Sequence, residues 1–212
     1  MRLLIFGPTG GTGARLLTQA LAAGHDVTVV ARDPLAIEVA DGARATVVTG
    51  DVLDPPSWTA AMSGQDAVLS CLGSRDRKRP TTVYSQGVRN ILGAMNAIGV
   101  RRLVCISSAG LEIPAGTPAM QRLVTRLVVQ RLYRRGYTDM AAMESVVAAS
   151  GVNWTIVRPP MLTDGPLTGH PWAAVTGHLP NASSISRQDL AYYLLTHIED
   201  RETWQKVIDV SS

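Results

Sequence analysis

Three glycines near the N-terminus, Gly7, Gly10 and Gly13, restrict the fold of this chain more than any other feature. They follow an apolar run at residues 3–6 and lead into a helix-like pattern at residues 13–23. A glycine-rich turn between a strand and a helix gathers free backbone N–H groups at the positive end of the helix dipole, where phosphate binds. The spacing therefore predicts a strand, a phosphate-binding turn and a helix at the start of the chain.

Each glycine of this turn has its own predicted role. Gly7 permits the tight turn, Gly10 lets the backbone approach a pyrophosphate, and Gly13 lets the helix pack on the strand. Thr9 and Thr12 can add hydroxyl donors. A glycine motif alone is weak evidence, but here it opens a strand–helix–strand unit, as a dinucleotide-binding motif requires.

Short apolar runs alternate with longer amphipathic segments along the chain, and this alternation predicts parallel strands joined by crossover helices. The runs are continuously apolar, as in a sheet covered on both faces. We expect strands at 3–6, 27–31, 46–49, 67–72, 103–106, 154–157 and 207–210, and helices at 13–23, 56–62, 82–98, 120–150 (broken near Gly136) and 187–198. The predicted fold is α/β, a Rossmann-like doubly wound parallel sheet with helices on both faces, in one domain over residues 1–212.

Size and composition fit a globular protein that needs neither disulfides nor a metal. The 212 residues are 46% hydrophobic and 17% charged, which excludes a disordered chain, and a domain of this size buries a sufficient core. Cys71 and Cys105 lie in apolar runs, so we expect buried thiols. The histidines do not cluster in sequence, and no metal-ligand spacing is present.

Charge and N-terminal sequence bear on partners and location. A formal net charge of +3 is too small for a nucleic-acid partner, and the basic stretch at 122–135 has the spacing of a solvated helix face. No apolar run reaches the roughly 18 residues of a membrane span, and the first apolar run is too short for a signal peptide. We expect a cytoplasmic protein without nucleic-acid or membrane partner, either a monomer or a homodimer.

The end of the second predicted strand bears on which dinucleotide binds. An acidic residue about 20 positions past the glycines would bind the ribose 2′-hydroxyl of NAD. Arg32 stands there instead, and a guanidinium can hold a 2′-phosphate through paired hydrogen bonds. The adjacent Asp33 keeps NAD open as the alternative, but Arg32 favours NADP(H) as the cofactor.

Two further strand ends carry candidate cofactor contacts. Asp51 and Val52 follow the third predicted strand, where the carboxylate either binds the adenine amino group or caps the turn. Leu72 and Gly73 end the fourth strand, beside the point where the strand order is expected to reverse. Open α/β sheets bind their ligands at that point.

Several segments resemble one group of oxidoreductases. Besides the glycine turn, these are residues 29–33, 50–52, 64–68, 80–83, 87–91, 158–160 and 164–169. With them the chain is similar, over nearly its whole length, to the atypical short-chain dehydrogenase/reductases, and within that group to the biliverdin IXβ reductase or flavin reductase family. The resemblance implies NADPH-dependent hydride transfer to flavins or linear tetrapyrroles in a loosely selective pocket.

The same resemblance implies a set of cofactor contacts and one catalytic residue. The implied cofactor contacts are Gly7, Thr9, Gly10, Thr12, Gly13, Arg32, Asp51, Val52, Leu72, Gly73, Ser107 and Pro159. Ser108 follows the fifth predicted strand at the place of the family's active-site serine. Its implied role is to orient the nicotinamide amide or the acceptor.

The chain departs from the related enzymes on the helix after that serine. Ordinary short-chain dehydrogenases use Tyr-x-x-x-Lys there, and the lysine lowers the pKa of the tyrosine that donates a proton. The equivalent positions hold Met140 and Glu144, which argues against the usual alcohol–ketone chemistry. The biliverdin-reductase-like family often has a histidine in place of Met140, so its absence weakens the case for a tetrapyrrole. Tyr137, almost one helical turn away, either substitutes or packs with Tyr133.

Flavin or quinone reduction fits a site without this acid–base pair, because water can supply the proton once hydride reaches an electron-poor ring. We expect a flat acceptor stacked on the nicotinamide, with substrate-facing loops at 111–118 and 159–180. Its predicted contacts are Leu111, Met140, Met161 and Trp172, beside Ser108 and Pro159. The alternative is a non-catalytic NADP(H) sensor resembling the NmrA-like regulators; a sugar epimerase or dehydratase is disfavoured because it needs the tyrosine.

Overall fold

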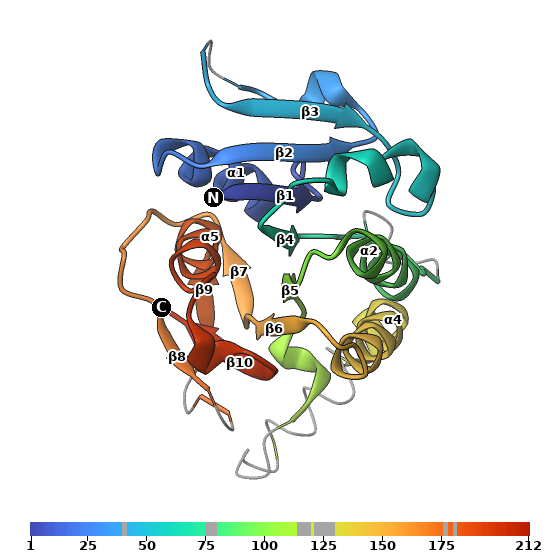
Figure 1. Cartoon of the computed structure of the whole chain (residues 1–212). Coiled ribbons are helices and arrows are strands. Elements are labelled where there is room, and N and C mark those ends of the chain that lie inside the picture. The colour runs from blue at the N-terminus through green and yellow to red at the C-terminus, as the bar shows by residue number, and fades with distance from the viewer. Residues whose placement is uncertain (40–41, 75–79, 114–119, 121–129, 176–177, 180–181) are drawn as a thin grey trace.

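An eight-stranded, mostly parallel sheet forms the centre of the fold (Figure 1). Its strands, in order across the sheet, are β3 (Ala45–Thr49), β2 (Asp26–Ala31), β1 (Arg2–Phe6), β4 (Ala67–Ser70), β5 (Arg102–Ile106), β6 (Asn153–Arg158), β10 (Lys206–Ser211) and β8 (Trp172–Ala174). A separate parallel pair joins β7 (Met161–Thr163) to β9 (Ser184–Ser186). This computed structural model describes residues 1–212 except 40–41, 75–79, 114–119, 121–129, 176–177 and 180–181.

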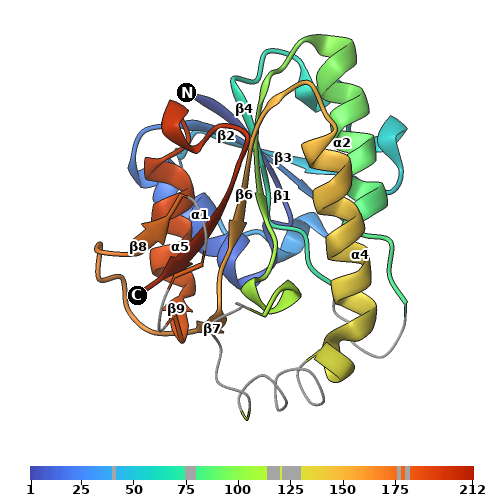
Figure 2. The same ribbon diagram turned by 90° about the horizontal axis from the view of Figure 1, so that it is seen from below.

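Helices cover both faces of the large sheet (Figure 2). α1 (Gly11–Ala22) and α5 (Arg187–Thr196) pack together on one face, and α2 (Ser85–Ile98) and α4 (Gln130–Ala148) pack together on the other. β1 pairs with β2 on one side and with β4 on the other, so the strand order reverses between β1 and β4. The predicted Rossmann-like, doubly wound fold is confirmed, and the reversal opens a crevice at the carboxyl ends of these strands.

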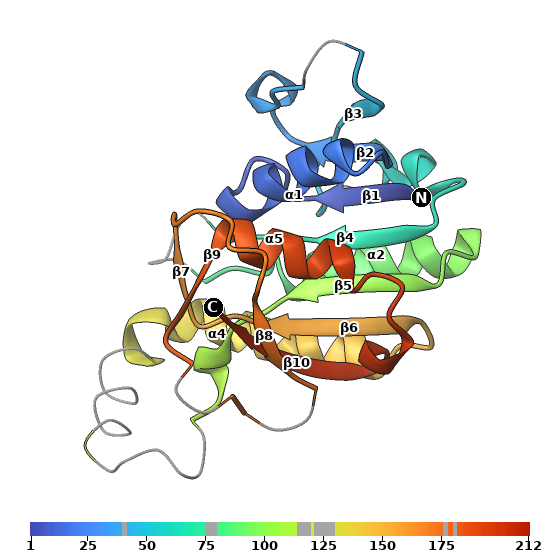
Figure 3. The same ribbon diagram turned by 90° about the vertical axis from the view of Figure 1, so that its left-hand side faces the viewer.

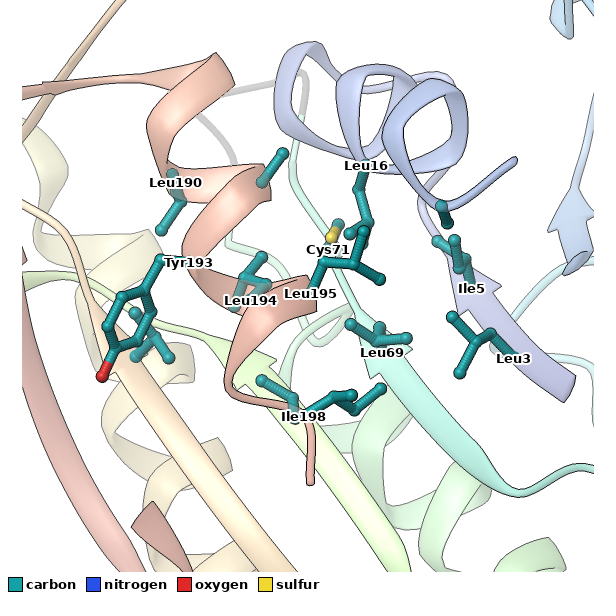
Figure 4. Close-up of a cluster of buried hydrophobic side chains, with 14 of the residues drawn as sticks. Leu3, Ile5, Leu16, Leu69, Cys71, Leu190, Tyr193, Leu194, Leu195 and Ile198 are labelled. Atoms are coloured by element: carbon teal, nitrogen blue, oxygen red, sulfur yellow. The ribbon is translucent and has the colours of Figure 1, made fainter. Parts of the chain in front are cut away.

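Two apolar cores lie on the two faces of the sheet, and β1 contributes to both through its alternating side chains. Leu3 and Ile5 pack with residues of α1 and α5, as Figure 4 shows. Leu4 and Phe6 pack on the opposite face, where the Phe6 ring meets the Trp58 ring edge to face at 4.8 Å between centroids. Burial on both faces explains why the strands read as continuous apolar runs.

Both cysteines are free thiols in the interior, as predicted. Burial raises the pKa of Cys71 to about 12, and burial likewise raises the pKa of Cys105. Neither sulfur is therefore a thiolate nucleophile near neutral pH. In the described part of the chain, no helix has both the length and the apolar character that crossing a bilayer demands.

Two of the structural expectations are wrong. The segment 56–62 forms two short 3₁₀ turns, η2 (Pro55–Ser57) and η3 (Thr59–Met62), because Trp58 between them adopts a non-helical conformation with φ −142° and ψ −9°. α4 continues through Gly136, since a mid-helix glycine costs only about 1 kcal/mol and keeps its N–H donor. The predicted parallel sheet gains one antiparallel edge strand, β8, which pairs with β10.

The loop predicted at 159–180 contains two strands, β7 and β8, which are too short for sequence periodicity to reveal. The other predicted loop, at 111–118, begins at the end of the short η4 turn (Ala109–Leu111) and is described only through residue 113. Most of the basic stretch at 122–135 and positions 176, 177 and 180 of the later loop also fall outside the described residues. The expectations for those positions stay predictions.

Candidate dinucleotide and acceptor site

The glycine turn follows β1 and leads directly into α1 (Figure 3). Gly7 adopts a φ of +77°, and a Cβ there would overlap the carbonyl of Cys71, at the end of β4. A Cβ on Gly13 would in turn overlap the carbonyl oxygen of Gly7. Both positions require glycine for backbone packing, which agrees with the tight turn and the close helix–strand contact that the motif predicts.

The N-terminus of α1 is open toward the carboxyl edge of the sheet. Gly10 is the N-cap residue and provides no side-chain hydrogen bond, and the first turn of α1 has no acidic residue. The first-turn N–H groups of a helix have no partner within the helix and carry partial positive charge. This end of α1 therefore has the chemistry to hold a phosphate group.

A cleft of about 600 Å³ lies in front of this turn. It is formed by the carboxyl ends of β1, β2, β3 and β4 and by the residues just after these strands. Eight of the predicted cofactor contacts line it: Gly7, Thr9, Gly10, Arg32, Asp51, Val52, Leu72 and Gly73. Thr12 and Gly13 are buried in the first turn of α1 behind the cleft, so the Thr12 side chain does not face it.

Arg32 and Asp33 differ in what their side chains already bind. An oxygen of the Asp33 carboxylate accepts the Leu35 N–H at 3.1 Å and so caps the short η1 turn (Pro34–Ala36). Arg32 lines the cleft and is exposed, and no described residue forms an ion pair with it. The arginine is thus the group available to an incoming phosphate, because Asp33 caps a turn and does not line the cleft.

Asp51 also has a structural role. Its Oδ1 accepts the Leu53 N–H at 2.9 Å, and its backbone oxygen accepts the indole N–H of Trp58 at 2.8 Å. The turn-capping alternative for Asp51 is therefore realised. Its position in the lining of the cleft leaves the second carboxylate oxygen for contact with a ligand.

A second cavity of about 280 Å³ adjoins the first, since Ser74 and Thr81 line both. Its other lining residues come from the start of α2, the end of β5, α4, the end of β6 and β7: Tyr84, Ser107, Ser108, Tyr133, Gly136, Tyr137, Met140, Pro159, Pro160 and Leu162. We call this the acceptor cavity. The predicted residues Ser107, Ser108, Met140 and Pro159 therefore meet here.

The two serines of the acceptor cavity are not equivalent. Ser108 Oγ accepts the Gly110 N–H at 3.2 Å and caps η4. Ser107 Oγ is buried and has no hydrogen-bond partner among the described residues. A buried hydroxyl without a partner is uncommon, so Ser107 rather than Ser108 has its full hydrogen-bonding capacity left for a ligand.

Tyr133 and Tyr137 form an aromatic wall of the acceptor cavity. Their rings stack with 5.8 Å between centroids and an interplanar angle of 28°. A Cβ on Gly110 would overlap the phenol oxygen of Tyr137 and come within 2.9 Å of its Cζ. Glycine at position 110 thus lets Tyr137 approach the chain just after Ser108. Both alternatives for Tyr137 hold in part, because it packs on Tyr133 and also lines the cavity.

A buried carboxylate sets the position of α4 against α2. Asp139 accepts the N–H of Tyr84 at 2.9 Å and the N–H of Ser85 at 3.3 Å, and also a hydrogen bond from the Ser85 hydroxyl. It therefore caps the N-terminus of α2 from a neighbouring helix. Because Asp139 lies between Tyr137 and Met140 in the sequence, this contact fixes the part of α4 that faces the acceptor cavity.

Glu144, at the position of the missing lysine, is engaged elsewhere. Arg158 donates to both of its carboxylate oxygens, at 2.9 and 2.5 Å, and to Glu112 at 2.9 Å. Hydrogen bonds from Arg158 hold the pKa of Glu112 below its usual value. This ion-pair cluster lines a separate groove that includes Leu111, so Leu111 does not face the acceptor cavity.

Two predicted substrate contacts lie outside both cavities. Met161 in β7 is 67% exposed, and Trp172 in the edge strand β8 is 45% exposed. Sequence reasoning did not select Tyr84, Tyr133 or Leu162, which do line the acceptor cavity. For Tyr133 the available signal was its spacing of four residues from Tyr137, which puts both rings on one face of a helix.

Comparison with protein families agrees with this geometry. A family model described as NAD(P)H-binding matches residues 7–201, and the chain belongs to this family. The matched segment begins at the first glycine of the turn and contains all of the acceptor cavity. The chain is therefore an NAD(P)H-binding protein, and the cleft in front of the glycine turn is its candidate dinucleotide site.

Individual proteins resemble the chain over its full length. It is 28% identical to an uncharacterised chloroplastic protein of Arabidopsis thaliana over 99% of this chain and 76% of that protein. A short-chain dehydrogenase/reductase of Veillonella parvula, solved with NADP, superposes with a TM-score of 0.79 at 19% identity, covering 100% of this chain and 94% of that one. A Streptococcus pneumoniae structure described as an NADH-flavin reductase has a TM-score of 0.79 at 20% identity, covering 100% and 99%.

Proposed function

We propose that this protein is an NADPH-dependent reductase that transfers hydride to a flat ring, a flavin or a quinone. The observation that carries the proposal is the junction of the two cavities at Ser74 and Thr81, where the dinucleotide cleft meets an aromatic-walled space. The NADP-bound and flavin-reductase structures that share the fold support it. Bound NADPH supplies the hydride from its nicotinamide ring.

The residues of the acceptor cavity suit orientation more than acid–base chemistry. Tyr133 and Tyr137 offer ring faces, and Met140 and Leu162 offer apolar contact, so a planar acceptor loses water on entering. The Ser107 hydroxyl can donate to a carbonyl oxygen of that ring. Holding the two reactants at short distance is the main contribution such a site makes, and a reduced flavin takes its proton from water.

The preference for NADPH rests on Arg32. Arg32 lines the cleft without an ion-pair partner among the described residues, whereas Asp33 does not line the cleft and caps the η1 turn. A bidentate contact between guanidinium and phosphate contributes roughly 1.5–3 kcal/mol. We expect Arg32→Ala to weaken NADPH binding about tenfold or more and to leave NADH binding nearly unchanged.

A steady-state assay of NADPH consumption tests the function. FMN, a quinone and biliverdin are the acceptors, NADH is run in parallel, and Arg32→Ala and Ser107→Ala are the variants. Turnover with FMN or the quinone, lowered by both changes, is the expected result. Tight NADPH binding without turnover of any acceptor would contradict it and favour the non-catalytic sensor, a role that the engagement of Glu144 with Arg158 also allows.

A further inference from the structure

Two residues, Ser74 and Thr81, line both the dinucleotide cleft and the acceptor cavity and therefore form the junction between them. Both are held by the two residues that come just before α2. The Ser74 N–H donates to the Tyr84 hydroxyl at 3.1 Å, and the Thr81 hydroxyl oxygen accepts the Val83 N–H at 3.2 Å. The shape of the junction thus depends on residues 83 and 84, and one of the two contacts is made by a tyrosine side chain.

Tyr84 is an unusual residue for its place in the helix. It is the N-cap residue of α2, a position that favours serine, threonine, aspartate or asparagine because a short polar side chain can accept a first-turn N–H. The Tyr84 side chain forms no such hydrogen bond. Asp139 of α4 accepts the N–H groups of Tyr84 and Ser85 instead. The cap is therefore supplied by another helix, while the hydroxyl of Tyr84 contacts the junction.

The Tyr84 side chain is anchored at both ends. Only 7% of the residue is exposed, and it belongs to the apolar core on the α2 side of the sheet, together with Val88 and Ile91. A closely packed ring has little freedom to move, and a buried tyrosine hydroxyl usually takes a hydrogen-bond partner. Here the hydroxyl bonds to the backbone of Ser74, which follows β4. Tyr84 is therefore a rigid spacer between the core and the junction.

We propose that Tyr84 is a positioning residue for hydride transfer. By holding Ser74, its hydroxyl fixes the junction at which the reactive end of a dinucleotide in the cleft faces a ring in the acceptor cavity. The inference rests on the proposed function and deepens it, because Tyr84 sets the distance between two bound reactants and not the affinity for either. Reaction rates depend steeply on that distance, and a misplacement of about 1 Å can cost about a hundredfold.

Tyr84→Phe removes the hydroxyl and keeps the packed ring, so it tests this hydrogen bond alone. Stopped-flow mixing of the protein–NADPH complex with increasing concentrations of FMN gives the limiting rate constant of a single turnover and the half-saturating FMN concentration. We expect the limiting rate constant to fall about tenfold, while the half-saturating FMN concentration and the NADPH dissociation constant stay within about twofold. A purely structural role would lower the amount of active protein and leave the rate constant of the folded fraction unchanged.

Tyr193→Phe is the matched control. Tyr193 is also buried, at 3% exposure, but it belongs to the core on the α1 and α5 side of the sheet and lines neither cavity. Its limiting rate constant is expected to equal that of the unmodified protein. The inference is overturned if Tyr84→Phe keeps the full limiting rate constant, if Tyr193→Phe loses as much, or if the loss in Tyr84→Phe lies in NADPH affinity.

The fluorescence of bound NADPH separates this inference from the proposed function. A nicotinamide ring emits more strongly when its surroundings hold it rigidly, so Tyr84→Phe is expected to lower the emission of bound NADPH at equal occupancy. If the unmodified protein reduces no acceptor, the proposed function is wrong, and the emission still tests Tyr84. A lower emission from Tyr84→Phe would then support the positioning role, and an equal emission from both proteins would overturn it.

Discussion

The dinucleotide cleft and the acceptor cavity adjoin each other but are built in different ways. Gly7, Gly10, Gly50 and Gly73 line the cleft where the chain turns after neighbouring strands. The acceptor cavity is lined mostly by larger side chains, among them three tyrosines, at or next to α2, β5, α4, β6 and β7. The dinucleotide cleft therefore depends on glycines after its strands, whereas the acceptor cavity depends more on large side chains.

The dinucleotide cleft and the acceptor cavity are therefore expected to tolerate substitutions differently. A site that depends on tightly packed glycines loses its shape when one of them gains a side chain, because the surrounding main chain has no room to move. A site made of side chains can change its ligand through one substitution while the fold persists. We therefore expect changes in the cleft to cost stability and binding together, and changes in the acceptor cavity to alter the reaction alone.

The largest effect is expected in the dinucleotide cleft. Gly7→Ala forces a side chain onto the Cys71 carbonyl at a φ of +77°, so we expect a loss of more than about 3 kcal/mol in unfolding free energy and no measurable NADPH binding. Gly24→Ala is the matched control: its φ is +81°, but a Cβ there meets no atom within 4 Å. We expect it to cost only about 1 kcal/mol in denaturant unfolding. Equal losses in both variants would mean that backbone strain, and not the packing of the turn on β4, fixes Gly7.

A buried carboxylate makes the segment beside the acceptor cavity sensitive to acid. β7, which contributes Leu162, is followed by a loop held by Asp189, whose carboxylate accepts the N–H groups of Thr168 and Gly169 at 2.8 and 3.0 Å. Burial alone would raise the pKa of Asp189, but these hydrogen bonds and those from the Ser186 and Thr168 hydroxyls outweigh burial, and its pKa lies below the usual value. The folded pKa is thus below the unfolded one.

Asp189 therefore stabilises the fold fully above the unfolded pKa, about 4, and loses its contribution as the pH falls through the folded value. We expect Asp189→Asn to lower the unfolding free energy by about 2 kcal/mol at neutral pH, with a difference from the unmodified protein that shrinks below about pH 4. Urea titrations from acid to neutral pH measure it, with the exposed Asp164→Asn as control. A difference that does not vary with pH would show that Asp189 acts by shape alone.

A change in the acceptor cavity is expected to leave cofactor binding unchanged. Gly110→Ala pushes the Tyr137 ring away from the chain after Ser108, which displaces one wall of the acceptor cavity. We expect kcat/KM for FMN to fall about tenfold to a hundredfold, as when a reacting group is displaced by about 1 Å, with an unchanged NADPH dissociation constant. Gly93→Ala on α2, where a Cβ meets no atom within 4 Å, is the control. A parallel loss of NADPH affinity would mean that the acceptor cavity cannot be changed without affecting the dinucleotide cleft.

The same division explains what could be predicted from the sequence. The glycine turn, Arg32 and the strand ends at Asp51 and Leu72 act through local backbone conformation and through their place after a strand, both of which a linear pattern encodes. The alternation of strands and helices predicts the parallel sheet and its crossover helices, but it does not by itself show that β4 pairs with β1 and not with β3. The fold class and the dinucleotide side were therefore accessible without coordinates.

The acceptor side was less accessible, because its residues meet only through tertiary packing. Met161 and Trp172 were selected for their type in a loop, yet β7 and β8 place both at the surface. The pairing of Asp139 with the N-terminus of α2 orients α4, and no local pattern reveals a helix cap supplied from another helix. For the same reason the sequence did not show that Glu144 is bound to Arg158.

The smallest effects distinguish the two serines of the acceptor cavity. Ser108→Ala removes the cap of η4, so we expect a loss of about 1 kcal/mol in unfolding free energy. Ser107→Ala removes a buried hydroxyl that has no partner among the described residues, so the stability is expected to change by less than about 0.5 kcal/mol, or to rise.

Activity then shows which hydroxyl serves the acceptor. If Ser107 donates to a carbonyl of the ring, Ser107→Ala lowers kcat/KM for FMN severalfold without a change in NADPH affinity, and Ser107→Thr restores part of the loss because it keeps the hydroxyl. Steady-state rates and denaturant unfolding of the same samples make the comparison. A Ser107→Ala variant with full activity, beside an impaired Ser108→Ala variant, would return the catalytic role to Ser108. The Ser108 hydroxyl would then donate to the acceptor while its oxygen accepts the Gly110 N–H. The acceptor cavity would in that case depend on backbone conformation as closely as the dinucleotide cleft does.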